Sequence, residues 1–140
     1  MADSVLVPDP PMERDWVLLE ESTAIGSKSG AEKFKVLSYN TLCDKYATQS
    51  QYGYTPRNAL AWDHRRGVIL DELRGHDADI LCLQEIDKES YEDYFRPALA
   101  ENPYRYKGAF WQKGRARTMG EKESKLVDGC ATFYKERKYV

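Results

Sequence analysis

The chain has 140 residues, a formal net charge of −2 and a sequence pI of about 5.7, a length that suits one domain or part of a larger one. Its 41% hydrophobic and 31% charged residues are typical of a globular fold and argue against a disordered or membrane-embedded chain. The acidic balance gives no global basic surface for nucleic acid, although a nuclease can confine its positive charge to a local patch. The three cysteines lack C-x-x-C spacing, which favours reduced thiols in an intracellular compartment.

Composition divides the chain into two regions. Residues 1–32 contain three prolines and a run of small polar residues, so we predict a linker or N-terminal extension there. A frayed terminus is the alternative. The globular part is expected over residues 33–140.

The first expected elements form a strand–helix–strand unit. They are a strand over 34–39, a helix over 55–73 and a strand over 80–83. Thr55, which is followed by proline, would cap the helix, and Gly75 would end it. Trp62, Ile69 and Leu73 would share its buried face. The continuous apolar run of the second strand predicts burial on both faces.

The second half of the chain predicts a further helix and two strands. We expect a helix over 88–100 that Pro97 kinks or shortens, a strand over 104–110, a polar loop over 111–127 and a strand over 130–134.

Asn40 and Glu85 are polar residues that end the first two strands. Because a strand–helix–strand crossover is right-handed and makes its strands parallel, both residues should emerge at the same edge of the sheet, where open α/β sheets place ligands. A carboxylate and an amide oxygen suit Mg²⁺, which is held by one or two carboxylates together with phosphate and water. The alternative also stands at this point: Asn40 turns the chain and Glu85 forms a surface ion pair.

Two segments resemble the first motifs of the endonuclease/exonuclease/phosphatase superfamily: Leu37-Ser38-Tyr39-Asn40 and the run from Asp79 to Glu85. An ordered series then narrows the resemblance to the carbon catabolite repressor type of poly(A) deadenylase, the catalytic subunit of the Not deadenylase complex. That series comprises residues 39–48, residues 52–54, Trp62 with Arg65 and Arg66, residues 115–119 and residues 127–134.

The resemblance implies a magnesium-dependent 3′-to-5′ exoribonuclease that removes adenylates from poly(A) RNA and releases 5′-AMP, with Mn²⁺ as the alternative ion. It implies other subunits of a deadenylase complex as partners, no membrane association, and a cytoplasmic and nuclear location. The implied fold class is α/β, the N-terminal portion of a four-layered, DNase I-like α/β sandwich whose two packed sheets carry helices on their outer faces. Residues 33–140 would form only the first part of the nuclease domain.

The catalytic and metal-binding residues that the resemblance carries over are Asn40 and Glu85. Glu85 matches the magnesium-binding glutamate, and Asn40 matches the asparagine that supports the metal and the scissile phosphate. The family's later aspartate–asparagine pair, its second metal-region aspartate, its terminal histidine and its adenine-binding residues would lie beyond Val140. We therefore expect the 140 residues alone to be inactive.

The loop before the last strand has the strongest local basic character. Lys113, Arg115 and Arg117 are candidate RNA contacts through sequence-independent phosphate binding, and a solvated loop is the alternative. Asp128 follows this loop and is expected to serve a turn.

Two other functions are compatible with the same fold. One is a phosphatase of the superfamily that acts on a nucleotide or inositol phosphate, and the other is a non-catalytic scaffold fragment that binds other subunits. The length of the ordered match favours the deadenylase.

Overall fold

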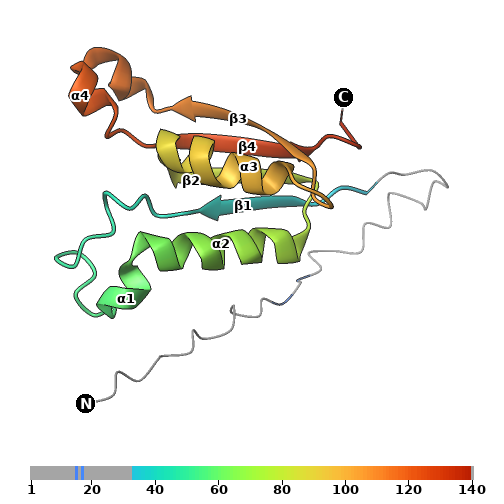
Figure 1. Cartoon of the computed structure of the whole chain (residues 1–140), viewed down its shortest axis with the longest axis horizontal. Coiled ribbons are helices and arrows are strands. Elements are labelled where there is room, and N and C mark those ends of the chain that lie inside the picture. Colours follow the sequence, from blue (N-terminus) through green and yellow to red (C-terminus); the bar gives the residue numbers. More distant parts are fainter. Residues whose placement is uncertain (1–14, 16, 18–32, 140) are drawn as a thin grey trace. The chain divides into compact units, whose positions relative to one another are not determined.

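The computed structural model describes residues 15, 17 and 33–139, so the predicted linker over 1–32 lies almost entirely outside the described part. Four strands form one mixed sheet in the order β1-β2-β4-β3 (Figure 1). They are β1 (Val36–Asn40), β2 (Ile80–Ile86), β3 (Tyr106–Gln112) and β4 (Gly129–Lys135). As the predicted crossover requires, β1 and β2 are parallel, whereas β4 is antiparallel to both of its neighbours.

Helical segments connect these strands. They are α1 (Arg57–Leu60), α2 (Trp62–His76), the π-helical η1 (Ser90–Phe95), α3 (Arg96–Ala100), the 3-10 helix η2 (Gly114–Thr118) and α4 (Glu121–Ser124). In the part of the chain that the structure describes, none of them is long and apolar enough to cross a membrane.

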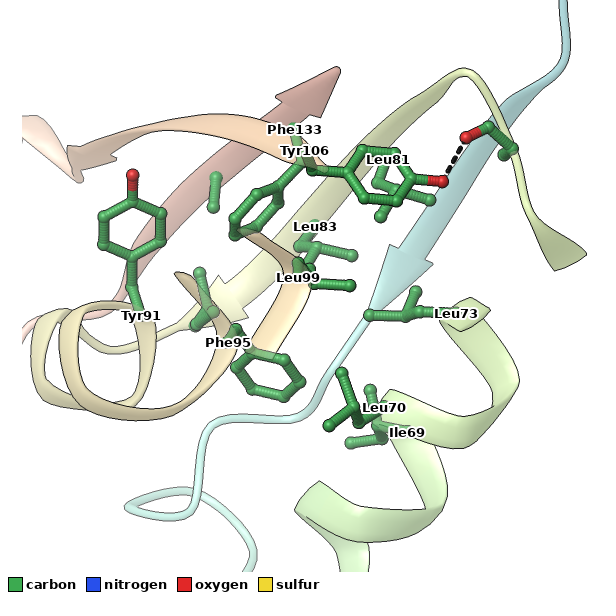
Figure 2. Packing of buried hydrophobic residues seen from close by; sticks show 13 residues of the cluster. Ile69, Leu70, Leu73, Leu81, Leu83, Tyr91, Phe95, Leu99, Tyr106 and Phe133 are labelled. Atoms are coloured by element: carbon green, nitrogen blue, oxygen red, sulfur yellow. Dashed lines mark hydrogen bonds between the residues drawn. The ribbon is translucent and has the colours of Figure 1, made fainter. Parts of the chain in front are cut away.

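The core lies on one face of the sheet. Leu81 and Leu83 of β2 and Phe133 of β4 are wholly buried there. The helical side chains that pack in the same cluster are Ile69, Leu70, Leu73, Tyr91, Phe95 and Leu99 (Figure 2). Burial of each such side chain contributes about 1.5–3 kcal/mol. The prediction that β2 is buried on both faces is only partly met, because Cys82 on the opposite face is half-buried and the described helices cover one face alone.

Tyr106 joins the start of β3 to the short segment between α2 and β2. Its buried hydroxyl donates a hydrogen bond to the carbonyl oxygen of Ala78, drawn as the dashed line in Figure 2. Burial raises the pKa of Tyr106 to about 12. The phenol therefore stays protonated over the ordinary pH range and keeps its donor role.

The single helix expected over 55–73 is wrong in its bounds. The chain leaves the helical conformation at Ala61, with φ −60° and ψ 133°, so that α1 and α2 are separate. Thr55 does not cap either helix, since Pro56 precedes α1. Helix α2 also runs past Gly75 to His76, and the next residue, Asp77, caps it with a left-handed φ of 45°. The predicted buried face is confirmed.

The second helical region covers residues 88–100 as predicted, but with a widened turn before Pro97. The N–H of Arg96 donates to the carbonyl of Tyr91, an i→i+5 bond that defines the π-helical segment. Because proline lacks an N–H and its ring would clash with the carbonyl four residues before it, the wider turn lets the helix continue. In place of the predicted kink or shortening, the structure has a π-helical turn before Pro97.

The last predicted strands are present with shifted bounds. β3 begins and ends two residues later than expected, and β4 extends one residue further at each end. The polar loop over 111–127 contains the end of β3 and the short segments η2 and α4.

Candidate catalytic edge of the sheet

Asn40 and Glu85 lie side by side at the carboxyl ends of β1 and β2. The Asn40 Nδ2 atom donates a 2.8 Å hydrogen bond to Oε1 of Glu85. Oδ1 of the same amide accepts a 2.8 Å bond from the main-chain N–H of Leu42, which fixes the amide orientation. The predicted proximity is confirmed. Asn40 does turn the chain, as the alternative proposed, and it also holds the Glu85 carboxylate.

A β-bulge presents Glu85 at this edge. Leu81 and Leu83 face the core, so strict alternation would direct residue 85 into the core as well. Glu85 instead has φ 53°, and the register with β4 shifts between Gln84 and Ile86. Ile86 is then 1% exposed and returns to the core face. The bulge therefore releases a carboxylate from the apolar face without leaving a polar residue in the core.

Thr41 fastens the bulge to the end of β1. Its main-chain N–H donates to the carbonyl of Gln84 at 2.9 Å, and its hydroxyl donates to the carbonyl of Glu85 at 2.8 Å. Thr41 is 1% exposed, so both bonds are shielded from water. Shielded bonds to main-chain groups hold the carboxylate-bearing residue in one conformation.

Arg65 of α2 fixes the loop that follows Asn40. Its guanidinium donates to three carbonyl oxygens, those of Leu60 at 2.9 Å, Thr41 at 3.0 Å and Leu42 at 2.8 Å. Burial lowers the pKa of Arg65, and Asp44 at 3.6 Å partly offsets that effect. One cation thus joins the break between α1 and α2 to the loop beside the candidate site.

A second cluster lies at the end of β3 and the start of β4, around Asp128. This carboxylate is 0% exposed and contacts Lys113 Nζ at 2.5 Å, the Tyr46 hydroxyl at 2.8 Å and Arg115 Nη2 at 3.3 Å. The same Arg115 nitrogen donates to the Tyr46 hydroxyl oxygen at 2.6 Å. We refer to these four residues as the Asp128 cluster.

The electrostatics of the Asp128 cluster keep its carboxylate charged. Burial by itself would raise the pKa of Asp128, but hydrogen bonds from Lys113 and Tyr46 outweigh it and hold the pKa below its ordinary value. The bond to Asp128 raises the pKa of Lys113, with a smaller contribution from the charge of Glu85. Burial and the Asp128 charge raise the pKa of Tyr46. A buried anion with a charged partner therefore persists near neutral pH.

Asp128 was expected only to serve a turn, and the structure corrects that expectation. The signal available in the sequence was its place between Val127 and Gly129, at the start of a strand whose inward positions are apolar. A carboxylate at such a position needs partners when it is buried. Those partners come from residues 13 to 82 positions away, which local sequence patterns do not reveal.

The three candidate RNA contacts are placed differently from one another. Lys113 and Arg115 are bound to Asp128, with side chains 45% and 55% exposed. Arg117 stacks over the exposed ring of Trp111, with 5.4 Å from its guanidinium carbon to the ring centroid. Lys113 and Arg115 are therefore held in place while part of each side chain remains accessible.

The donor set at the sheet edge fits a hard divalent cation only in part. Glu85 supplies a carboxylate, and Mg²⁺ binds with one or two carboxylates when phosphate and water complete its shell. Within residues 15, 17 and 33–139, no three His, Cys, Asp or Glu side chains gather as a complete metal site. Glu85 would therefore act as one ligand among several.

Comparisons with known proteins identify what this chain resembles. The family model described as Endonuclease/Exonuclease/phosphatase family matches residues 37–139. The CCR4-Not complex 3′-5′-exoribonuclease subunit Ccr4 of Phaeosphaeria nodorum is 60% identical over 133 residues, which are 95% of this chain and 21% of that protein. The protein of the same name from Coccidioides immitis is 58% identical over 132 residues, 94% of this chain and 17% of that protein.

A solved structure of lower sequence identity also matches this chain. The crystal structure of ANGEL2, a 2′,3′-cyclic phosphatase, in complex with adenosine-2′,3′-vanadate is 31% identical, with a TM-score of 0.58 over 74% of this chain and 27% of that one. These similarities confirm the predicted α/β fold class. The chain spans about a fifth of the length of the two Ccr4 relatives.

Proposed function

Because the chain belongs to the endonuclease/exonuclease/phosphatase family, we propose that it forms part of a 3′-to-5′ exoribonuclease that shortens poly(A) tails and releases 5′-AMP. The observation that carries this proposal is the Asn40–Glu85 pair, held at 2.8 Å at the carboxyl ends of two parallel strands. The exoribonuclease name of the Ccr4 relatives supports the reaction.

The proposed cofactor is Mg²⁺, with Mn²⁺ as the alternative ion. Glu85 would hold the cation, and Asn40 would support it by fixing the carboxylate through Nδ2. When bound, such a cation polarises the phosphate, stabilises the leaving oxygen and positions water. The chain's own contribution is orientation, because the bulge, Thr41 and Asn40 together limit the conformations of Glu85.

RNA contact is assigned to Lys113, Arg115 and Arg117. Phosphate binding by Lys and Arg needs no sequence recognition and weakens as salt rises. Support comes from the Asp128 cluster, which carries two cations and one anion and directly precedes β4, where Gly129 pairs with Ile86, the residue after Glu85. A cluster with net charge +1 beside the carboxylate suits a polyanionic substrate.

The wider setting follows from the relatives. Their name places Ccr4 in the CCR4-Not complex, so the proposed partners are poly(A) RNA and the other subunits of such a complex. The location that we propose with this role is the cytoplasm and the nucleus. With one carboxylate at the described edge, the 140 residues alone should bind Mg²⁺ weakly and hydrolyse no RNA.

The second candidate function is a phosphatase that acts on a small ester. The observation that favours it is the similarity to ANGEL2, a 2′,3′-cyclic phosphatase. A non-catalytic scaffold is the third possibility and would require neither Glu85 nor a cation.

One screen separates the three candidates. The natural full-length protein is assayed with Mg²⁺ against oligo(A), mixed-sequence RNA and small phosphate esters, beside a Glu85→Gln variant that keeps the shape but removes the charge. We expect release of 5′-AMP from oligo(A), with at least about a hundredfold loss in the variant. A preference for a small ester would select the phosphatase, and no hydrolysis of any substrate would select the scaffold. Equal activity of both proteins would refute the site.

A further inference from the structure

We propose that Asp128 is a positioning residue that holds Lys113 and Arg115 for contact with an RNA phosphate next to Glu85. This inference rests on the proposed function, since it assumes a polyanionic substrate at the same edge of the sheet. It is carried by the geometry of the Asp128 cluster, in which one wholly buried carboxylate contacts two partly exposed cations.

The burial of Asp128 requires the contacts that it makes. An ionised carboxylate without partners is very costly in a protein interior. Here Lys113, Arg115 and the Tyr46 hydroxyl surround it within 2.5 to 3.3 Å. Breaking one contact would leave the buried carboxylate without a full set of partners, which is energetically unfavourable. The two cations therefore stay beside Asp128.

The cluster joins the two chain segments that flank the candidate site. Tyr46 lies in the loop that follows Asn40, Lys113 directly follows β3, and Asp128 directly precedes β4. The backbone contributes as well, because the Lys113 N–H donates to the Asp128 carbonyl at 3.0 Å. The end of the β3–β4 hairpin is therefore fixed relative to the loop that follows Asn40.

Charge and geometry predict opposite effects when the Asp128 charge is removed. The Asp128→Asn variant gains one positive charge overall, so a role in charge balance alone predicts tighter RNA binding. If Asp128 positions its partners, an asparagine amide donor would face the Lys113 ammonium, the cations would lose their fixed places and binding would weaken. The sign of the change distinguishes the two roles.

The test measures binding without hydrolysis. Fluorescence anisotropy of a labelled oligo(A) is followed with the natural full-length protein carrying Glu85→Gln in every variant. We expect Asp128→Asn to weaken binding roughly tenfold and Tyr46→Phe, which removes one donor without a charge change, roughly threefold. Lys122→Ala, on the same β3–β4 connection in α4, is the matched control and should change affinity less than about twofold.

Two measurements distinguish a positioning role of Asp128 from a general loss of stability. They are the coupling between substitutions at Lys113 and Asp128 and the salt dependence of RNA affinity. Lys113→Ala should reduce the slope of log affinity against log salt by about one, and Asp128→Asn added to it should cost little more, because both act through the same contact. In the protein with Glu85 intact, Asp128→Asn should raise KM while kcat stays within about twofold. If Asp128→Asn fails to fold, Tyr46→Phe carries the test.

Each outcome decides the inference. Equal or tighter binding by folded Asp128→Asn, an unaltered affinity for Tyr46→Phe, or no oligo(A) binding at all overturns it. Binding that depends on Asp128 in a protein without hydrolytic activity would refute the proposed function but keep the inference. If the protein hydrolyses oligo(A) but its binding does not depend on Asp128, the proposed function is kept and the inference is refuted.

Discussion

Replacing Asn40 with aspartate would set two carboxylates against each other at the edge of the sheet. The Asn40 Nδ2 atom lies 2.8 Å from Oε1 of Glu85, so Asn40→Asp exchanges a donor for a negative oxygen at that distance. Two unit charges 2.8 Å apart repel by about 1.5 kcal/mol in bulk water. Screening over a Debye length of about 8 Å reduces this to about 1 kcal/mol, the suitable value because Asn40 is exposed.

The lost hydrogen bond adds to the repulsion. Its net value to an exposed pair is about 1 kcal/mol, so Asn40→Asp should lower the free energy of unfolding by about 2 kcal/mol at pH 7. Oδ1 can still accept from the Leu42 N–H, which limits the damage to the contact with Glu85. At low pH a protonated carboxyl carries no charge and can donate the hydrogen bond that the Asn40 amide made, so below about pH 4 the penalty should fall under about 0.5 kcal/mol.

Urea unfolding at pH 7 and at pH 3.5 measures both values. Asn58→Asp, which introduces the same charge at an exposed position in α1, serves as the control and should cost less than about 0.5 kcal/mol at either pH. A pH-independent loss, or equal losses in the two variants, would refute the reasoning that Asn40 holds Glu85.

Three further predictions concern the scaffold. Gly108→Ala should lower the free energy of unfolding by about 2 kcal/mol, because its Cβ would lie 2.6 Å from the wholly buried ring of Phe133. Tyr106→Phe should cost about 1–2 kcal/mol at pH 7. The Tyr106 pKa of about 12 exceeds its unfolded value of about 10, so the wild-type chain should lose stability as pH rises between those values. The Tyr106→Phe variant should lose less over the same range. Denaturation at each pH measures both. Asp87→Ala should cost about 1–2 kcal/mol in thermal unfolding, because both of its carboxylate oxygens accept bonds from Ser90 at 2.9 Å.

Matched substitutions test each of these reasons. Gly67→Ala, whose Cβ would meet nothing within 4 Å, should be neutral or stabilising by up to about 1 kcal/mol. Tyr104→Phe retains the ring against Arg74 and should cost less than about 0.5 kcal/mol at pH 7. Asp93→Ala, an exposed position in η1, should cost less than about 0.5 kcal/mol. A control that equals its partner variant would contradict the corresponding contact.

The sequence was sufficient to predict the arrangement of the candidate site. Apolar runs placed β1 and β2, and the handedness of the crossover then required Asn40 and Glu85 to meet at one edge, as they do. The helix over 88–100 was also predicted, because its spacing of apolar residues outweighs Pro97. These predictions depend on short-range periodicity and one topological rule.

Features that depend on contacts between distant residues were not predicted. The break at Ala61 lies next to Leu60, whose carbonyl accepts from Arg65, and the same guanidinium holds the loop after β1. The burial of Asp128 depends on side chains from two other segments. Neither set of partners is adjacent in the sequence, so local propensity gave a continuous helix and a turn instead.

The bulge at Glu85 has a consequence for how the chain tolerates deletions. Removing residue 85 would join Gln84 to Ile86, so that the isoleucine follows Leu81 and Leu83 in regular alternation and the ladder with β4 becomes uninterrupted. Such a deletion would keep the apolar face of β2 regular, but it would remove the carboxylate and also the Glu85 carbonyl that accepts from the buried Thr41 hydroxyl. The single inserted residue therefore serves two purposes, because its side chain presents the carboxylate and its main chain anchors the loop that follows β1.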